Sequence, residues 1–457
     1  MTTTTATMMT PKDSFDRFGD DLCQLLLQYL PIEVKLRLES VSKQWKSLIF
    51  TTETHLVFDD RLLETLSLIS LTENKKTTNY FKTIVKKCPN ITTVTISYIY
   101  LPDNYLELMI RYCNRLTHLS LDNVYNNNWL NSGDLFERFC CRFGQQLLTF
   151  KYEKYHINDI PINRQLFFRH IQNLANLKTL NIKSIIGSDI LFADIFSGHP
   201  TSYYTFPKTL QSLSLKLYPN SMPVFVKFAK TSCQLMTSMD IDIDYNNNNE
   251  DINWSLISTG LSQMPQLRQL AIDFGTNHIK SHIIDELLIT IRHNCPQLKS
   301  LSLKVFKIPV KPIIVSINKH LSKQLRRLSL DITDSLTTDS ILTSDLLKRL
   351  NRLTHLTLHL YERHLIGDQF FLDIHRNLPR LQYINCDKMS ITEKSIQAMG
   401  QLAHLMTVYL TDSKNRLITS KSFISNHLVI DTNVNNLFIK YLDSMGKQLF
   451  IRGINCL

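Results

Sequence analysis

The segment PQLKSLSL, residues 296–303, sets the pattern on which the fold of this chain depends. It follows the template L-x-x-L-x-L, in which apolar and polar residues alternate at the period of a β-strand. The same template recurs, with conservative exchanges, at twelve places along the chain. The first apolar residues of the twelve copies are Ile91, Leu116, Leu147, Leu177, Leu210, Met236, Leu267, Leu298, Leu325, Leu353, Leu381 and Leu405.

The spacing of these copies averages about 28 residues, which lies within the range of leucine-rich repeats. Between the copies lie stretches such as residues 281–292, whose apolar residues recur at helical spacing. Each copy therefore predicts a strand, a turn and a helix, and such units bury their apolar faces only by stacking. The predicted fold class is α/β: a curved leucine-rich-repeat solenoid of about twelve units, with a parallel sheet inside and helices outside.

A different pattern precedes the repeats. Residues 18–50 have the sequence FGDDLCQLLLQYLPIEVKLRLESVSKQWKSLIF, which predicts three short helices. Pro31 separates the first helix from the second, and Ser42 is placed to cap the third. A bundle this small cannot bury all of its apolar residues. We expect Leu27 and Leu36 to need a second surface to cover them.

This N-terminal segment resembles an F-box, whose pattern is roughly LPxELLxxIFxYLPxxDLxRLxxVCKxWRxL. The matching positions are Leu22, Leu26, Leu27, Tyr29, Leu30, Pro31, Val34, Arg37, Leu38, Val41, Lys43, Trp45 and Leu48. The departures are Phe18-Gly19 in place of Leu-Pro, Glu33 in place of Asp and Ser42 in place of Cys.

The resemblance implies the substrate-recognition subunit of an SCF-type ubiquitin ligase. By the resemblance, the F-box docks the Skp adaptor, and through it the cullin and RING subunits, while the repeats hold a protein substrate of unknown identity. The adaptor-binding residues that it implies are Leu22, Leu26, Leu27, Leu30, Pro31, Val41 and Trp45. Two alternatives remain: a helical cap on the first repeat, and a non-ligase repeat scaffold with a degenerate F-box.

The sequence predicts four segments. They are a disordered N-terminus over residues 1–13, an F-box over 14–51, a connecting strand and helix over 52–89, and the repeats over 90–457. The last part of the repeat segment is less regular. It contains a strand-like run at residues 427–430 and a helical stretch predicted from Asn435 to Met445.

Binding is better supported by the sequence than catalysis. Alternation along each strand places one set of side chains on the concave surface of the sheet. These side chains mix both signs of charge, which suits a protein partner of complementary charge. The substrate-binding candidates are Lys183, Lys216, Asp240, Asp242, Asp273, His355 and His359. Nucleic acid is not expected, because single strands need a continuous basic groove with aromatic residues. The formal net charge of +11 keeps a polyanion binder as a further hypothesis.

The chain carries no phosphate-binding, nucleophile-elbow or HExxH motif, so we expect no enzyme activity, no cofactor and no metal. Its nine cysteines are odd in number and none are spaced as CxxC, which favours reduced, buried thiols. For the vicinal pair Cys140-Cys141, helix packing is favoured over a redox site.

No apolar run is long enough to cross a membrane. The expected location is the cytoplasm, the nucleus or both.

Overall fold

The structure of the protein is a computed structural model, and it describes part of the chain. The described residues are 19–30, 32–59, 62–63, 74–97, 104–122, 124, 133–153, 164–182, 206–219, 222–243, 253–333, 341–360, 365–389, 392–412, 428–433, 436–442 and 448–453. They fall into two compact units, one ending at Leu210 and the other beginning, in its described part, at Gln211. The predicted disorder of residues 1–13 lies outside the described residues.

The first unit begins with four short helical elements, α1 (Asp20–Gln28), α2 (Ile32–Arg37), η2 (Leu38–Ser40) and α3 (Lys43–Thr52). The predicted cap is confirmed, because the Ser42 hydroxyl accepts a hydrogen bond of 3.1 Å from the Trp45 backbone N–H. Trp45 and Ile49 of α3 are buried, as are Cys23 and Leu27 of α1. The two helices contact each other through these faces.

The rest of the first unit alternates strands and helices. The strands are β1 (His55–Phe58), β2 (Thr93–Ser97), β3 (His118–Asp122), β4 (Thr149–Glu153) and β5 (Thr179–Asn181). The helices are α5 (Asn74–Lys87), α6 (Asn104–Tyr112), α8 (Gly133–Phe143) and α9 (Arg164–Ile171). Neighbouring strands pair in parallel and in chain order. The sheet thus begins with β1, within the segment that the sequence assigned to the connection.

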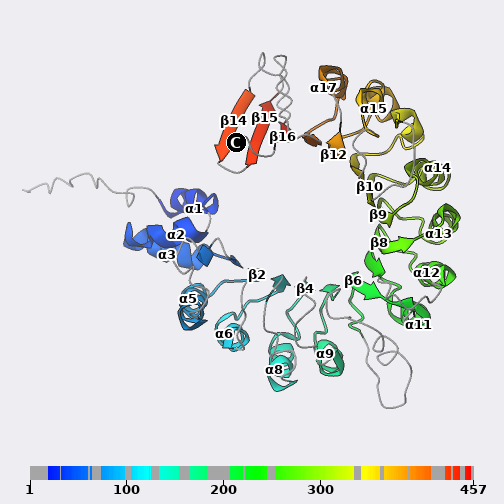
Figure 1. Ribbon diagram of the computed structural model, residues 1–457. Coiled ribbons are helices and arrows are strands. Elements are labelled where there is room, and N and C mark those ends of the chain that lie inside the picture. Colours follow the sequence, from blue (N-terminus) through cyan, green and yellow to red (C-terminus); the bar gives the residue numbers. More distant parts are fainter. Residues whose placement is uncertain are drawn as a thin grey trace, which may run out of the picture. The chain divides into compact units, whose positions relative to one another are not determined.

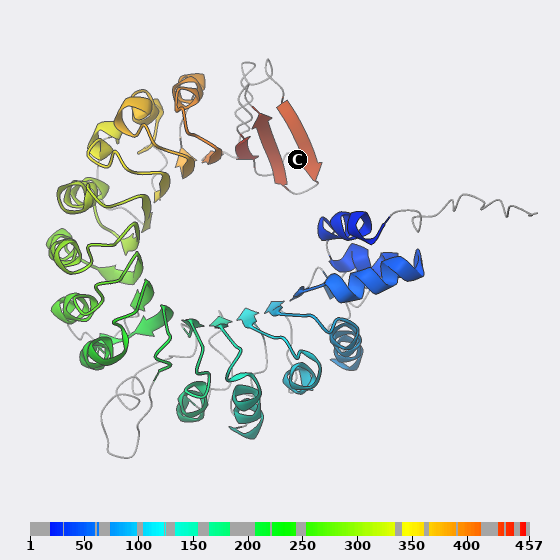
Figure 2. The same ribbon diagram turned by 180° about the vertical axis from the view of Figure 1, so that it is seen from behind.

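The second unit continues the same alternation. Its parallel strands are β6 (Ser212–Leu217), β7 (Ser238–Ile243), β8 (Gln269–His278), β9 (Ser300–Phe306), β10 (Arg327–Thr333), β11 (His355–Leu360), β12 (Tyr383–Met389) and β13 (Thr407–Asp412). Its helical elements are α11 (Met222–Ser232), α12 (Trp254–Leu261), α13 (Ser281–Asn294), α14 (Val310–Leu321), η4 (Ser344–Leu347), α15 (Asp368–Phe371), α16 (Ile374–Asn377) and α17 (Glu393–Gly400). In each unit the helices cover one face of the sheet and leave an open face (Figures 1 and 2).

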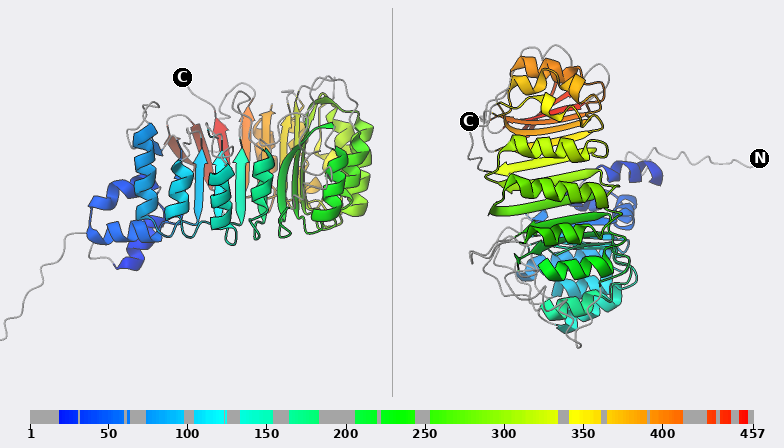
Figure 3. Two further views of the ribbon diagram at one scale, coloured as in Figure 1. Left: turned by 90° about the horizontal axis from the view of Figure 1, so that it is seen from below. Right: turned by 90° about the vertical axis from the view of Figure 1, so that its right-hand side faces the viewer.

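The alternation of the template explains this arrangement, and the predicted leucine-rich-repeat fold is confirmed. All twelve first apolar residues of the template, from Ile91 to Leu405, are buried. Along β9, Leu301, Leu303 and Val305 are buried, whereas Ser300, Ser302 and Lys304 lie on the open face. The parallel strands can be followed in Figure 3. Each repeat therefore contributes one strip of apolar core between the sheet and its helix.

Four cysteines occupy one position of the repeat, three residues before the first apolar residue of the template. They are Cys88, Cys113, Cys233 and Cys295, and all four are buried. In other repeats Leu174, Met264, Leu350, Leu378 or Leu402 fills this position, also buried. Cysteine here behaves as a small apolar residue. The two vicinal cysteines differ in exposure: Cys140 is buried and Cys141 is exposed.

The strands begin at what we call the entry edge of the sheet, where the main chain forms a ladder. The N–H groups of two successive residues, such as Thr92 and Thr93, share the carbonyl oxygen of one residue in the preceding repeat, here Thr54, at 2.9 and 3.0 Å. Thr117 and His118 share the Thr92 carbonyl in the same way. The ladder keeps equivalent residues of adjacent repeats side by side.

The C-terminal segment departs from the prediction. The helix expected from Asn435 to Met445 is wrong, because β15 (Asn436–Leu442) pairs antiparallel with β14 (Leu428–Asn433) and β16 (Gln448–Gly453). The run Phe438-Ile439-Lys440-Tyr441 is rich in residues that favour strands, and two strand partners satisfy its backbone. This sheet is separate from the parallel one, and β16 contacts β13.

Candidate functional site

Helix α1 presents an apolar face that the described part of the chain leaves uncovered. We call Leu22, Leu25 and Leu26 of α1, together with its C-cap residue Tyr29, the α1 face. They are 43%, 48%, 42% and 81% exposed, respectively. Their spacing of three, four and seven residues puts them on one side of a helix. Because large apolar side chains rarely cluster on a surface without a partner, this face is a candidate docking site.

The opposite side of α1 holds this face in place. Cys23 and Leu27 point into the core with Trp45 and Ile49 of α3. At the start of the helix, the Gln44 side-chain amide donates a 2.6 Å hydrogen bond to the Asp20 carboxylate. Asp20 and Asp21 also lie in the first turn, where a carboxylate complements the helix dipole.

The adaptor-binding residues implied by the resemblance divide into two groups. Leu22, Leu26 and Val41 are exposed, and Leu30 is half-buried, so all four remain open to a partner. Leu27 and Trp45 are buried inside the chain, so these two support the core instead of offering contact surface. The expectation that Leu27 needs a second surface is thus wrong. Pro31 lies outside the described residues.

Two residues of the α1 face were missing from that set. Leu25 and Tyr29 share the helical spacing of Leu22 and are among the more exposed large apolar side chains of the described chain. Helical periodicity alone could have found them, whereas the F-box pattern does not distinguish inward from outward positions.

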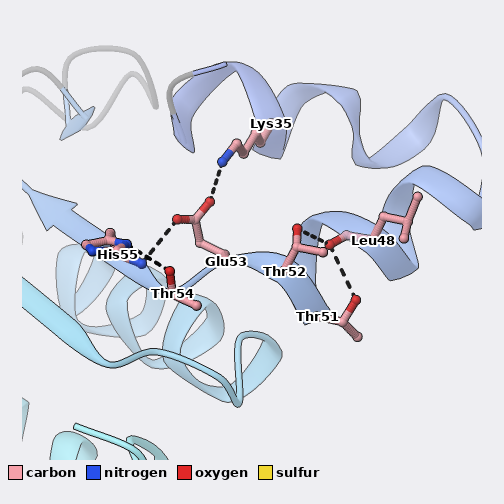
Figure 4. A network of polar contacts seen from close by, with 7 residues as sticks. All are labelled: Lys35, Leu48, Thr51, Thr52, Glu53, Thr54 and His55. Atoms are coloured by element: carbon pink, nitrogen blue, oxygen red, sulfur yellow. Dashed lines mark hydrogen bonds and ion pairs between the residues drawn. The ribbon is translucent and has the colours of Figure 1, made fainter. Parts of the chain in front are cut away.

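Polar contacts fix these helices to the first strands and helix of the repeats, within the same unit. The Lys35 ammonium lies 2.6 Å from a Glu53 carboxylate oxygen, and Glu53 also accepts from the His55 backbone N–H at 3.3 Å (Figure 4). The Lys87 ammonium of α5 lies 2.8 Å from Glu39 and 4.8 Å from the centre of the Phe50 ring.

The second candidate surface is the open face of the sheet in the second unit. In register, Lys216, Asp242, Asp273, Lys304, Asp331 and His359 form one row across β6 to β11. Asp240 lies in the neighbouring row, which otherwise carries small residues such as Ser302 and Ser329. The structure therefore brings together six of the seven predicted substrate-binding residues on one face, while Lys183 lies outside the described residues.

Lys304 neutralises part of the acidic row. Its ammonium lies 2.8 Å from Asp273 on the adjacent strand. The hydrogen bond to Asp273 raises the pKa of Lys304 and outweighs its partial burial, and the charges of Asp273, Asp331 and Asp242 add to the increase. The negative charge of this row is thus partly balanced by Lys304 of the same chain.

His355 belongs to another row, at the start of β11. Its ring stacks on Tyr383, with ring centres 5.5 Å apart, and Nδ1 lies 2.9 Å from the Thr354 hydroxyl. Partial burial lowers the pKa of His355, and the positive charge of Arg327 on the adjacent strand lowers it further. Neutral imidazole is therefore favoured at this position. His359 lies on the same face, with the Asn385 amide 3.5 Å from its Nε2.

Within the described residues, no group of three or more His, Cys, Asp or Glu side chains is arranged to hold a metal ion. None of the described helices combines the length and apolar character needed to cross a membrane.

No protein-family description and no curated protein sequence matches the chain. Among solved structures it is similar to Rad7 in the yeast complex of Rad7 and Elc1, with 16% identity and a TM-score of 0.47, over 88% of this chain and 91% of that one. An internalin from Listeria monocytogenes shares 13% identity over 74% of this chain and 88% of that one, with a TM-score of 0.35. TLR13, in a complex with ssRNA13, shares 14% identity over 81% and 56% of the two chains, with a TM-score of 0.30.

Proposed function

We propose that this chain is the substrate-recognition subunit of an SCF-type ubiquitin ligase. The α1 face would dock the Skp adaptor, and the open face of the repeats would bind a protein substrate. The observation that carries the proposal is the exposure of Leu22, Leu25, Leu26 and Tyr29 on one side of α1. The F-box-like pattern around them supports the adaptor as the occupant.

Apolar burial would drive this docking. Covering apolar surface contributes roughly 25 cal/mol per Å². Four large side chains at helical spacing form the kind of ridge that inserts into a groove of a partner. Cys23, Leu27, Trp45 and Ile49 would keep that ridge in position without touching the adaptor.

The repeats would supply the second half of the function. Their open face carries charges of both signs and small polar residues, which favours a protein surface with a matching charge pattern. In this proposal the chain performs no catalysis itself, because other subunits of the ligase transfer ubiquitin. The cytoplasm and the nucleus are the expected locations.

Co-purification with the Skp adaptor tests the first half. We expect Leu26→Asp to abolish binding, since it places a carboxylate in the centre of an apolar contact. Val315→Asp on α14 is the matched control, because Val315 is an exposed apolar residue far along the chain. Trp45→Ala is less suitable, because it removes a buried side chain and would loosen the helices.

Full adaptor binding by Leu26→Asp would overturn the proposal. If even the unaltered chain fails to bind the adaptor, the alternative holds: a non-ligase repeat scaffold with a degenerate F-box. The departure at Gly19 favours that alternative, since α1 begins there without a side-chain cap.

A further inference from the structure

Cations gather at the entry edge of the second unit. The turns that lead into β8 to β13 comprise residues 262–268, 295–299, 322–326, 348–354, 378–382 and 401–406, and they contain no Asp or Glu. We define the basic edge as Arg268, Lys299, Lys323, Arg326, Arg327 and Arg352, all of which are exposed. They serve four consecutive strands, β8 to β11.

The main-chain ladder sets these cations side by side. The Lys299 N–H donates to the Arg268 carbonyl at 2.8 Å, and the Arg326 N–H donates to the Lys299 carbonyl at 2.8 Å. Adjacent strands in a sheet lie about 5 Å apart. The side chains of Arg268, Lys299 and Arg326 therefore extend from equivalent positions about 5 Å apart. Arg352 adds a fourth repeat, with its guanidinium donating to the Lys323 carbonyl at 2.9 Å.

No carboxylate within the described residues forms an ion pair with the basic edge. The Arg268 side chain contacts the Gln297 amide oxygen at 3.3 Å, which leaves its charge uncompensated. Lys304, farther along β9, behaves differently, because Asp273 lies 2.8 Å from it. In the first unit the described ladder positions are Thr54, Thr92, Thr117, Leu148 and Lys178, so one cation lies among them, whereas Arg268, Lys299 and Arg326 are consecutive.

The pKa of His355, which lies next to the basic edge, is lowered in part by the positive charge of Arg327. Arg327 is in register with His355, which is in register with Tyr383. The lowered pKa of His355, caused by burial and then by Arg327, agrees with excess positive charge at this end of the strands. The stacked His355 and Tyr383 rings offer a flat surface beside the arginine.

We propose that the basic edge binds an extended, acidic polypeptide segment of a protein partner. An extended chain turns every second side chain to one side, about 7 Å apart. The cations start from strands about 5 Å apart, and their long, flexible side chains can spread to meet alternating Asp or Glu residues. The arginine guanidinium matches a carboxylate with two parallel hydrogen bonds. This inference names the substrate chemistry for the repeat half of the proposed function and rests on that half alone.

One observation favours a polypeptide over nucleic acid. Single-stranded nucleic acid is held by a series of stacking aromatic residues. Along the basic edge, the described strands β8 to β12 provide one stacked pair, His355 and Tyr383.

Fluorescence anisotropy on the full chain tests the proposal. The probe is a fluorescein-labelled peptide of alternating Glu and Ser, about twelve residues long. Its affinity is measured for the unaltered chain and for Lys299→Gln/Arg326→Gln/Arg327→Gln. The control is Lys227→Gln/Lys230→Gln/Lys280→Gln, which removes the same charge from exposed positions away from the basic edge. A thermal unfolding profile for each variant verifies that it is folded.

We expect the edge variant to bind the peptide about tenfold more weakly, which corresponds to about 1.4 kcal/mol shared by the three lost charge contacts, and the control to differ by less than about twofold. Equal loss in the two variants would show attraction by net charge and would overturn the proposal. Preferential, edge-dependent binding of an unlabelled thymidine oligonucleotide of equal length, used as competitor, would also overturn it. Since no adaptor is present, failure of the docking by α1 leaves this outcome unaffected.

Discussion

The ammonium of Lys35 on α2 lies 2.6 Å from the carboxylate of Glu53, the residue that links α3 to β1. Both side chains are largely buried, and Glu53 also binds the His55 backbone N–H. This pair connects the helices that carry the α1 face to the first strand of the sheet. It is therefore one of the contacts that join the two parts of the first unit, together with those of Lys87 and Asn90.

Lys35→Met should loosen that junction, because it leaves the Glu53 carboxylate buried without its cation. Breaking a buried pair in this way costs about 3 kcal/mol. Hydrogen exchange should show faster exchange in α3 and β1, with the second unit unchanged. The double variant Lys35→Met/Glu53→Leu should recover part of the protection, and a double variant as weak as the single one would contradict this reasoning.

Gly260 on α12 permits a close approach to Phe225 on α11. A Cβ atom at position 260 would lie 2.3 Å from a carbon of the Phe225 ring. Gly260→Ala should therefore destabilise the second unit by about 1–3 kcal/mol through overpacking. Urea unfolding measures this, and Phe225→Leu in the same chain should restore part of the loss. Gly400→Ala is the control, because a Cβ there has no atom within 4 Å.

Asp368 of α15 holds the start of α17. Its carboxylate accepts from the Thr392 N–H at 2.7 Å, the Thr392 hydroxyl at 2.6 Å and the Ser395 hydroxyl at 2.5 Å. Partial burial raises the pKa of Asp368, but the hydrogen bonds from Ser395 and Thr392 outweigh it and the net pKa is lowered. The stabilisation is thus complete above the unfolded-state pKa of about 3.9 and disappears as the pH falls through the lower folded-state value.

Asp368→Asn should accordingly lower the urea midpoint near neutral pH, by the loss of about 1–2 kcal/mol. The difference from the unaltered chain should shrink below about pH 4, because the carboxylate is protonated there in the unfolded chain and, at still lower pH, in the folded chain as well. A difference that stays constant down to pH 2 would show that the charge of Asp368 is irrelevant.

The cysteines should differ sharply in reactivity. Burial raises the pKa of Cys88 and Cys113 to about 12 and that of Cys295 to about 11, which leaves little thiolate at neutral pH. Cys141 is exposed. Brief iodoacetamide treatment of the native chain, followed by peptide mapping, should modify Cys141 and spare these three. Rapid labelling of Cys88 in the folded chain would contradict its burial.

The fold was largely predictable, because the decisive pattern is repeated twelve times. The alternation in Leu301-Ser302-Leu303 specifies which side of a strand is buried, and each copy repeats the specification. The segment from Asn435 to Met445 has no such copies. There an apolar run could suit a helix or a strand, and pairing with two neighbouring strands determined the outcome.

The candidate sites were less predictable, for two physical reasons. A family pattern gives residue types without orientation, so Trp45 and Leu27 were assigned to contact although they form the core. The basic edge consists of single cations such as Arg268, Lys299 and Arg326, which are scattered in the sequence. Only the stacking of repeats gathers them, and no local pattern signals it.

The contacts between the N-terminal helices and the first repeat have a consequence for protein engineering. Lys87 of α5 contacts both Glu39 and Phe50, and the Asn90 amide donates to the Thr51 carbonyl at 2.6 Å. A chimera that grafts these helices onto a foreign repeat array at residue 52 would sever all of these contacts. A graft junction after Asn90 would transfer β1 and α5 as well, and would keep the contacts that hold the helix carrying the α1 face.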